Sequence, residues 1–492
     1  MVGQHKQHAY IKIFNVENDA LNLSPQFYYN SCACNEIDSI MRRHILGDIP
    51  NFVSNNTELQ KLEREFDLFA GLLEESGLRF KQLPYKVVID NTRPNIKARY
   101  KRAYHNLLHK RLIYSDLLAK GQSFIKYEKM DITKYEERKP PRLIQHRSFE
   151  FLYLLKSFVL DFDMQIKHTD VVVNGQKPCT IFAKSHDNVG VASIIEEHWK
   201  SFRFPCAYCL DHSKFDGHVN VDLLNIAHSF WNRIFKNKLL RRMLSHTIIN
   251  KFVTKNGIRY KFKGARCSGE YTTSTENSLL NYFMLTCWVK SSGISNFKIL
   301  VNGDDSIVFL DQTERHKLLP LTYFNNFNME TELDKIAFDL HQISFCQASP
   351  MLQDDRLTMI KDPIRTISRA LYTSEQHRKC LDKLLSASGL CELACNQGIP
   401  ILQEFALFLL RSGNFSKPLQ SIDKIPACRS RNVVRILKIK SETRDQFSRA
   451  FGIDPWQQIQ IEQQLAGLSI LTPEYQEKLQ EFILINKDFI QI

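Results

Sequence analysis

The sequence predicts an α+β fold in which a β-hairpin presents the residues that are candidates for chemistry. Strand-like runs at 297–302 and 306–310 flank Asn302-Gly303, which is a strong signal for a β-hairpin turn. An apolar, helix-like run at 278–289 comes directly before this hairpin. From about residue 361 the chain is mainly helical. Breaks in this helical part fall at Pro400, Pro418, Pro426 and Pro455.

The size and charge of the chain limit its class. Its 492 residues suffice for roughly three domains, and a hydrophobic content of 43% supports a large buried core. Lys and Arg outnumber Asp and Glu by 66 to 53, which gives a net charge of +13. This balance favours a polyanionic partner such as nucleic acid, or an anionic membrane surface, although charge alone does not separate these from a solubility effect.

No targeting or membrane-spanning segment is recognisable. Residues 1–14 lack the apolar centre of a signal peptide, Val2 excludes N-myristoylation, and no uninterrupted apolar run reaches about 18 residues. The 12 cysteines have no regular spacing, which indicates reduced thiols in a cytosolic protein. Three pairs of cysteines lie close in sequence, at 32/34, 206/209 and 391/395. None of them has a second pair at the spacing of a zinc finger, so we expect no zinc site.

Two helices are predicted upstream of the hairpin. Apolar residues recur at three- and four-residue spacing over 58–77, and Gly77 closes this helix. A second helix is predicted from about Ile96 to Lys120. This helix carries many basic residues. They are equally consistent with a helix face that only contacts solvent and with a surface that binds phosphates.

An extended basic segment is predicted after these helices. Pro140-Pro141 ends any helix and forces residues 141–148 onto the surface as an extended segment. This segment carries Arg142 and Arg147, which are five residues apart. Side chains at an odd spacing in a strand point to opposite faces, so both arginines can face one ligand only if the segment bends.

Two adjacent carboxylates, Asp304 and Asp305, follow the predicted turn. Asp is common in turns, so one of them needs no further reason. A second carboxylate adds repulsion unless a cation lies beside the pair, so the hairpin tip is a candidate Mg²⁺ site. Two Mg²⁺ ions about 4 Å apart can support phosphoryl transfer, but one hairpin tip cannot surround both. Asp211, at the end of the strand-like run 205–210, is the expected second source.

The order of these motifs resembles that of RNA-dependent RNA polymerases of positive-strand RNA viruses, closest to the tombusvirus-like group. The likeness spans about residues 96–465. DHSKFDGHV (211–219) resembles motif A of the palm, SGEYTTSTENSLLN (268–281) motif B, and VNGDDSIVF (301–309) motif C. Further similar stretches are FIKYEK (124–129) and PRLIQHRS (141–148) in the fingers, ISFCQ (343–347) after motif D, and FGIDPWQQ (451–458) near the thumb.

This resemblance implies a right-hand polymerase fold with fingers, palm and thumb, an antiparallel palm sheet and a mainly helical thumb. The expected domains are 1–84 (N-terminal extension or fingers), 85–205 (fingers with the basic nucleotide-entry segment), 206–360 (palm with some fingers insertion) and 361–492 (thumb). The implied reaction is template-directed addition of ribonucleotides to RNA by a two-metal mechanism, which replicates an RNA genome.

The resemblance also implies roles for individual residues. Asp211 and Asp304 would bind both metal ions with help from Asp305, and the expected ion is Mg²⁺, with Mn²⁺ as an alternative. Arg142 and Arg147 would hold the incoming triphosphate. The other residues expected to bind the nucleotide or template are Asp216, which would read the ribose, and Ser268, Gly269, Thr273 and Asn277.

The expected partners are an RNA template and product, NTPs, and a separate viral or host protein that anchors the chain at membranes of the host cytoplasm. Neither the oligomeric state nor the mode of initiation is indicated. Two alternatives stay open. One is a catalytically weak RNA-binding subunit that keeps the polymerase fold, and the other is a reverse transcriptase.

Some positions depart from the family pattern or have a simpler interpretation. Glu270 stands where Asp is usual, Glu276 where a small residue is usual, and Glu330 where a general-acid lysine would be expected; Lys335 is near but does not align. Thr273 and Glu276 also fit a capping box, so Thr273 alternatively caps the helix that follows. Gly269 alternatively permits a turn with positive φ. Residues 1–84 match no motif.

Overall fold

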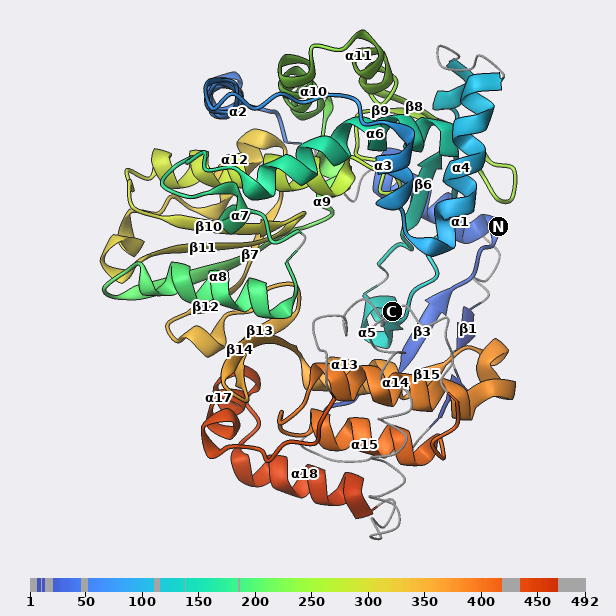
Figure 1. The fold of residues 1–492 in the computed structure, drawn as a ribbon, viewed down its shortest axis with the longest axis vertical. Helices are drawn as coiled ribbons and strands as arrows, with labels where there is room; N and C mark the ends of the chain where they lie inside the picture. The colour runs from blue at the N-terminus through green and yellow to red at the C-terminus, as the bar shows by residue number, and fades with distance from the viewer. Residues whose placement is uncertain are drawn as a thin grey trace.

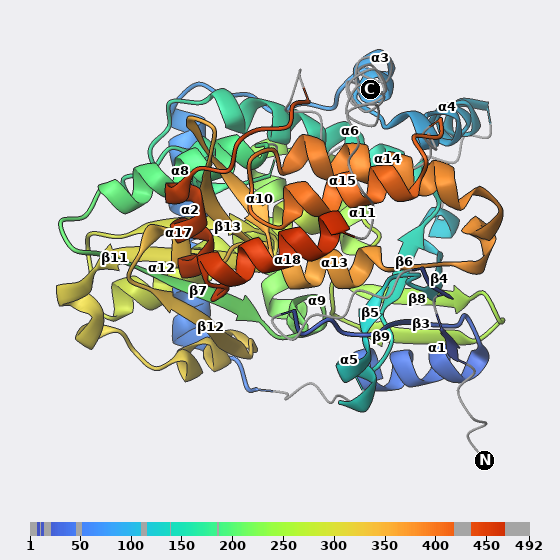
Figure 2. The ribbon, with the colours of Figure 1, turned by 90° about the horizontal axis from the view of Figure 1, so that it is seen from below.

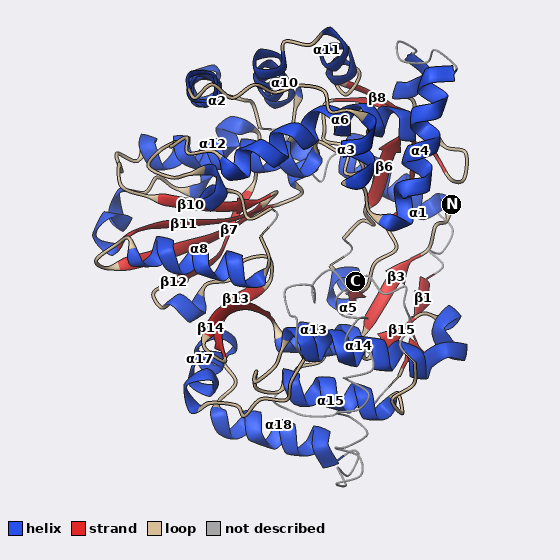
Figure 3. Ribbon diagram, in the orientation of Figure 1, coloured by secondary structure: helices blue, strands red, loops and turns tan. Residues whose placement is uncertain are grey.

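The computed structural model describes residues 7–9, 11–13, 21–45, 52–109, 116–137, 139–184, 186–417 and 434–467. Its helices and mostly antiparallel sheets confirm the predicted α+β class (Figure 1, Figure 3). One sheet, which has four strands, lies on the left of Figure 1, a second sheet lies among helices at the top right, and the C-terminal helices lie below. We call the first of these the central sheet.

The central sheet is antiparallel and has helices on both faces (Figure 1). In spatial order its strands are β10 (Lys298–Asn302), β11 (Asp305–Asp311), β7 (Pro205–His212) and β12 (Thr331–Ala337). One face, with Val301 and Val308, belongs to the core that includes helix α12 (Thr273–Ser291). The other face, with Ile307, packs with α8 (Asn188–Lys200). Both faces are buried over β10, β11 and β7, so these three strands are apolar almost throughout, whereas the edge strand β12 is largely polar and exposed.

Helix α12 is buried along nearly its whole length, from Thr275 to Val289. A helix that is apolar on all sides needs neighbours on all sides. These include α2 (Asn56–Glu75) and α10 (Val221–Phe235). The predicted helix 58–77 is thereby confirmed as α2, which the Asn55 side chain caps and which ends before Gly77, whose φ is +79°.

The second sheet contains the extended basic segment. Its strands, in spatial order, are β6 (Leu143–Arg147), β4 (Gly121–Ile125), β8 (Ile249–Thr254) and β9 (Arg259–Lys263). The prediction of an extended segment is confirmed, but its placement wholly on the surface is wrong, because Leu143, Gln145 and Arg147 are buried. They face a core shared with α1 (Ala33–Ile40) and β3 (Gln26–Tyr29).

The predicted basic helix is shorter than expected. It forms α4 (Pro94–His109), while residues 110–115 lie outside the described residues. Asp116–Ala119 form a single 3₁₀ turn, and β4 begins at Gly121. A Cβ atom at Gly121 would lie 1.9 Å from the ring of Phe252, so the neighbouring strand requires glycine there. Strand pairing therefore overrides helix propensity beyond residue 115.

The N-terminal segment connects distant parts of the chain. Strand β3 pairs with β1 (Gln7–Ala9) and with β5 (Met130–Asp131), whereas β2 (Ile11–Lys12) pairs with β15 (Tyr372–Thr373). Figure 1 shows this blue segment running from the upper part of the molecule down to the C-terminal helices. Residues that matched no motif thus join the two halves of the chain.

The C-terminal part is mainly helical, as predicted, and has its own apolar cores. Pro363 and Pro455 each begin a helix, and Pro400 lies between two helices, whereas Pro418 and Pro426 lie outside the described residues. Figure 2 shows these helices stacked across the molecule. They follow the hairpin β13 (Ala348–Gln353) and β14 (Arg356–Lys361) and are α13 (Pro363–Ala370), α14 (Leu381–Cys395), α15 (Leu402–Ser412), α17 (Ser441–Phe451) and α18 (Pro455–Gly467).

None of the helices in the described ranges is both long and apolar enough to cross a membrane. The remaining α-helices of these ranges lie beside the elements named above (Figure 2). They are α3 (Tyr85–Asp90), α5 (Ile132–Glu136), α6 (Phe149–Gln165), α7 (Pro178–Ile181), α9 (Phe215–His218) and α11 (Lys238–Ser245).

Candidate active site

The hairpin between β10 and β11 turns one residue later than the sequence predicts. Asn302 pairs with Asp305, so the two-residue turn is Gly303-Asp304 and Asn302 belongs to β10. Gly303 has a φ of +71°, as the first central residue of a type II′ turn requires. The register that buries Val301 and its neighbours decides this position, because a shift of one residue would turn every apolar side chain to the other face. Asp304 therefore stands in the turn, and Asp305 begins β11.

The sheet register brings Asp211 to the same place. Leu210 pairs with Ser306 across β7 and β11, so the next position on each strand sets Asp211 beside Asp305. Two carboxylates from the hairpin and one from β7 thus meet at one end of the sheet. This meeting was expected from the order of the motifs, and the strand pairing supplies its physical basis.

The three carboxyl groups have raised pKa values. Burial, followed by the charge of Asp304, raises the pKa of Asp305 to about 6. Burial and the charge of Asp304 also raise the pKa of Asp211. Burial, together with Asp216, raises the pKa of Asp304, while Arg142 opposes this shift. Solvent reaches Asp211 and Asp304 through a cavity, but the surrounding protein and the neighbouring carboxylates still disfavour their charged forms.

A cavity of about 210 Å³ brings these carboxylates opposite cations. Asp211, Asp216 and Asp304 line it, together with the basic side chains of Arg43, Arg142 and Lys214. Asp305 lines an adjacent cavity of about 160 Å³ that Asp211 shares. A site with anionic and cationic walls suits a ligand that carries phosphates together with bound cations.

The donors fit hard divalent cations such as Mg²⁺, which prefer carboxylate oxygens and keep several other oxygen ligands. Within the described residues, no three His, Cys, Asp or Glu side chains lie close enough together to hold a metal ion by themselves. Asp211 and Asp304 would therefore share an ion with oxygens from a bound phosphate or water. Mg²⁺ in nucleotide-binding enzymes is commonly held in this way, by one or two carboxylates and the phosphates.

Asp216 lies at the centre of a hydrogen-bond network. The Ser268 hydroxyl donates to one of its carboxylate oxygens at 2.5 Å, and the Asn277 amide donates to the other at 2.7 Å. The Asn277 carbonyl accepts from Arg266 Nε at 3.2 Å, and Arg266 forms a buried ion pair with Glu276. The structure thus brings together three of the predicted residues, and it explains Glu276 as the partner of Arg266.

Thr273 and Gly269 hold the loop that precedes α12. The Thr273 hydroxyl donates to the Cys267 carbonyl at 2.9 Å, and the N-cap residue is Thr272, so the alternative that Thr273 caps the helix is wrong. Gly269 has no positive φ. Its amide donates to the Gln145 carbonyl at 3.0 Å, and a Cβ atom would lie 2.4 Å from that oxygen. Close approach of β6, and not turn geometry, therefore requires glycine.

The two predicted arginines occupy different environments. Arg142 is exposed, lines the 210 Å³ cavity and lies 3.7 Å from Glu128. Arg147 is 1% exposed and donates to Glu270 at 2.6 Å, to the Ala119 carbonyl and to Asn250. One arginine thus lines the cavity and the other points into the interior, so the two do not converge on one ligand. In this conformation Arg147 supports the loop that carries Glu270, and the arrangement does not support direct contact between Arg147 and a triphosphate.

Sequence reasoning missed the residues that fix the hairpin tip. The Gly303 amide donates to Ser278 Oγ at 2.8 Å, and the Asn281 amide donates to the Gly303 and Asp304 carbonyls, both at 3.0 Å. His212 bonds the Asn281 carbonyl oxygen at 3.0 Å, which orients the amide. Burial lowers the pKa of His212 to about 4, so this imidazole is neutral. Polar residues inside an otherwise apolar helix were the available signal.

Arg43 was also missed, because its segment matches no motif. It lies in a π-helical turn, Met41–Ile45, and donates to the carbonyls of Pro140 and Pro141. Burial, followed by the charge of Arg142, lowers the pKa of Arg43 to about 10. The N-terminal segment therefore contributes a cation to the cavity and holds the start of the segment that carries Arg142.

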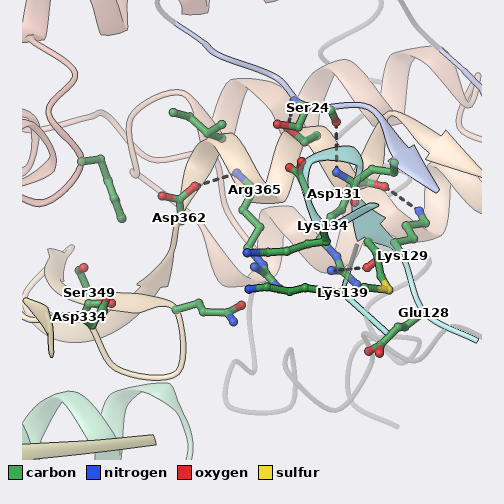
Figure 4. Close-up of a pocket in the computed structure, with 18 of the residues that line it drawn as sticks. Ser24, Glu128, Lys129, Asp131, Lys134, Lys139, Asp334, Ser349, Asp362 and Arg365 are labelled. Carbon is green, nitrogen blue, oxygen red and sulfur yellow. Dashed lines mark hydrogen bonds between the residues drawn. The ribbon is translucent and has the colours of Figure 1, made fainter. Parts of the chain in front are cut away.

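A larger cavity of about 740 Å³ adjoins the site. Figure 4 shows Asp334 and Ser349 on one side and Arg365 of α13 with its N-cap residue Asp362 on another. Glu128, Lys129, Asp131, Lys134 and Lys139 lie on the third side. Arg43 and Arg142 line both cavities. Lys335, which did not align with the family's general acid, lines the larger cavity as well. Three distant segments of the chain therefore enclose one basic space beside the carboxylates.

The fold and the site define a class of protein. A central antiparallel hairpin presents clustered carboxylates opposite arginines, an arrangement suited to phosphoryl transfer with divalent cations. Comparison with known proteins agrees. Residues 8–472 match the family of viral RNA-dependent RNA polymerases, and the chain belongs to this family.

Individual relatives come from plant viruses. The chain is 28% identical over 440 residues to the RNA-directed RNA polymerase of tobacco necrosis virus (strain A), covering 87% of this chain and 60% of that protein. It is 28% identical over 388 residues to the RNA-directed RNA polymerase of turnip crinkle virus, covering 75% and 49%. The chain thus spans about half the length of the relatives that it matches.

Proposed function

We propose that this chain catalyses template-directed addition of ribonucleotides to the 3′ end of RNA, with release of pyrophosphate, as part of viral genome replication. The observation that carries the proposal is the 210 Å³ cavity, in which Asp211 and Asp304 face Arg43 and Arg142. Family membership supports the same conclusion. The right-hand division follows from it: residues 206–360 as palm, 85–205 as fingers, 361–492 as thumb, and 1–84 as an extension of the fingers.

Each residue in the cavity has a proposed task. Asp211 and Asp304, with Asp305 beside them, hold divalent cations, expected to be Mg²⁺ with Mn²⁺ as an alternative. Such ions would stabilise the attacking and leaving oxygens of the displacement. Arg142, supported by Arg43, offsets the negative charge of the incoming triphosphate.

The residues around Asp216 position the sugar and template. Asp216 accepts from Ser268 and Asn277, so the two donors fix the carboxylate that would read a ribose hydroxyl. Gly269 and Thr273 hold the loop beside it. Arg147 acts indirectly in this proposal, through Glu270. Recruitment to membranes by a separate anchoring protein stays a prediction.

Primed extension on an RNA template with Mg²⁺ tests the proposal. The full chain should extend with NTPs in preference to dNTPs, and the opposite preference would favour a reverse transcriptase. Asp211→Asn and Asp304→Asn should each abolish extension while RNA affinity stays near that of wild type. Asp311→Asn, at the other end of β11, is the matched control and should extend normally. Near-normal extension by Asp304→Asn would remove the assignment of the site.

A further inference from the structure

The second sheet leaves one face open to solvent. Along its strands buried and exposed side chains alternate, and the buried set faces the core with α1 and β3. The other set has no helix over it in the described residues and is exposed or half-buried. We call it the open face. Its residues are Ile144 and His146 of β6, Gln122 and Phe124 of β4, Ile249, Lys251 and Val253 of β8, and Arg259, Lys261 and Lys263 of β9.

Positive charge on the open face is uncompensated. Lys251 lies directly opposite Lys261, and Arg259 and Lys263 flank this pair along β9. Like charges at opposite positions of an antiparallel pair destabilise a sheet. The four strands contain no Asp or Glu. None of the four basic side chains has a hydrogen bond or ion pair with any described residue. An anionic ligand bound here would offset this repulsion.

Exposed apolar side chains lie among these charges. Ile249 is 46%, Phe124 39% and Val253 39% exposed. The Phe124 ring contacts that of His146 at a centroid distance of 5.9 Å. At this end of the sheet Phe124 also lines a cavity of about 730 Å³ with Tyr28, Tyr127 and Lys255. Aromatic rings beside lysines offer stacking for bases together with neutralisation of phosphates.

The two edge strands of this sheet connect to loops of the candidate active site. β6 is an edge strand, and the Gly269 amide donates to its Gln145 carbonyl at 3.0 Å. β9 leads through Gly264 to Arg266, whose amide donates to the Asp216 carbonyl at 2.7 Å. The site cavity is lined by Leu143, which belongs to the buried set, so nucleic acid on the open face would pass an edge of the sheet to reach the loops that hold Ser268 and Asp216.

We propose that the open face binds single-stranded RNA, with Lys251 and Lys261 on phosphates and Phe124 stacked on a base. This inference rests on the proposed function and names an RNA contact outside the carboxylate cavity. A membrane surface would favour a larger contiguous apolar patch than the Phe124–Ile144 pair, whereas here basic residues occupy most open-face positions of β9 and the centre of β8. Unpaired bases are favoured over a duplex because only they expose a ring to Phe124.

The double variant Lys251→Gln/Lys261→Gln tests the phosphate contacts in the full chain. Binding of a fluorescently labelled single-stranded RNA is measured by anisotropy over a range of salt concentrations. Loss of two phosphate contacts should lower the slope of log affinity against log salt by about 1.4, and affinity at low salt should fall roughly tenfold. The Tm should stay the same or rise, because the substitution removes repulsion. Lys200→Gln, whose side chain pairs with Glu196 on α8, is the matched control.

Phe124→Leu tests stacking separately. It should weaken binding of single-stranded RNA and leave binding of a duplex of equal length unchanged. Unchanged RNA affinity and salt slope in the double variant would overturn the proposal, and so would a selective loss of binding to phosphatidylserine vesicles. Extension by the wild-type chain is measured independently. Its failure would remove the proposed function, while a binding defect in the variants would still support the open face as an RNA site.

Discussion

At the scale of single residues, Asp305 lies opposite Asn302 and beside both Asp211 and Asp304. Its pKa is raised to about 6, from an ordinary value of 3.8. Between these values the folded chain holds a proton that the unfolded chain has lost. Unfolding therefore releases that proton, and the stability contributed by Asp305 falls as pH rises through this window. At neutral pH, in the absence of metal ions, the charged carboxylate destabilises the fold.

Asp305→Asn should therefore stabilise the metal-free protein at pH 7.5. The free energy of unfolding should rise by about 1–3 kcal/mol, which is what a pKa raised from 3.8 to about 6 implies. The gain should shrink at pH 5, where the wild-type carboxyl is largely protonated. Thermal unfolding in EDTA at both pH values measures the effect. Asp170→Asn, at an exposed site, is the control. A gain that is equal at both pH values would show that charge at Asp305 is not the cause.

At the scale of elements, the contact between α12 and the hairpin positions the carboxylates. The Asn281 side-chain amide donates two hydrogen bonds to carbonyls of the turn. The Gly303 amide of the turn donates a third hydrogen bond to the Ser278 hydroxyl of α12. The turn therefore cannot move without α12. Because α12 is buried along its length, it is a rigid support for the site.

Asn281→Ala should lower kcat for single-nucleotide addition much more than it weakens RNA binding. It leaves the Gly303 and Asp304 carbonyls and the His212 ring without this partner, which should cost about 1–3 kcal/mol of stability. Rapid-quench extension at saturating NTP and urea unfolding measure the two effects. Thr286→Ala removes a hydroxyl that bonds only within α12 and serves as the control. Equal losses of kcat in both variants would mean that the hairpin contact has no special role.

At the scale of the whole molecule, the N-terminal and C-terminal parts are held together around the basic cavity. Lys129 Nζ donates to the Arg369 carbonyl at 2.6 Å and to the Tyr372 carbonyl. Arg369 donates back to the Lys129 carbonyl at 3.0 Å. Pairing of β2 with β15 adds a second connection. The cavity of about 740 Å³ is therefore enclosed by contacts between segments more than 200 residues apart.

Lys129→Met keeps the apolar stem and removes this bridge. We expect a lower Tm and faster release of RNA during extension, because the part carrying α13 can then separate from β5. Product length under single-encounter conditions, with a trap for released protein, measures the second effect. Lys317→Met, at an exposed i,i+3 pair, is the control. Wild-type product lengths in Lys129→Met would mean that the bridge does not retain RNA.

What the sequence determined by itself is local. The period of apolar residues identified α2, α12, β7 and the β10–β11 hairpin, and the charge pattern identified Asp211, Asp304 and Asp305 as a group. Such features depend on neighbours within one element, so a single stretch of sequence contains the information. The order of the motifs then sufficed to identify the family.

Only the tertiary structure decided which polar groups meet. Arg147 is buried against Glu270, 123 residues away, and Arg43 enters the cavity from a segment with no motif. The turn moved to Gly303-Asp304 because the packing of both sheet faces sets its register. Whether a charged side chain is buried, and which residues of two strands pair, depends on partners distant in sequence. The energies of desolvating the charge and of pairing the strands outweigh local preference. No local pattern records those partners.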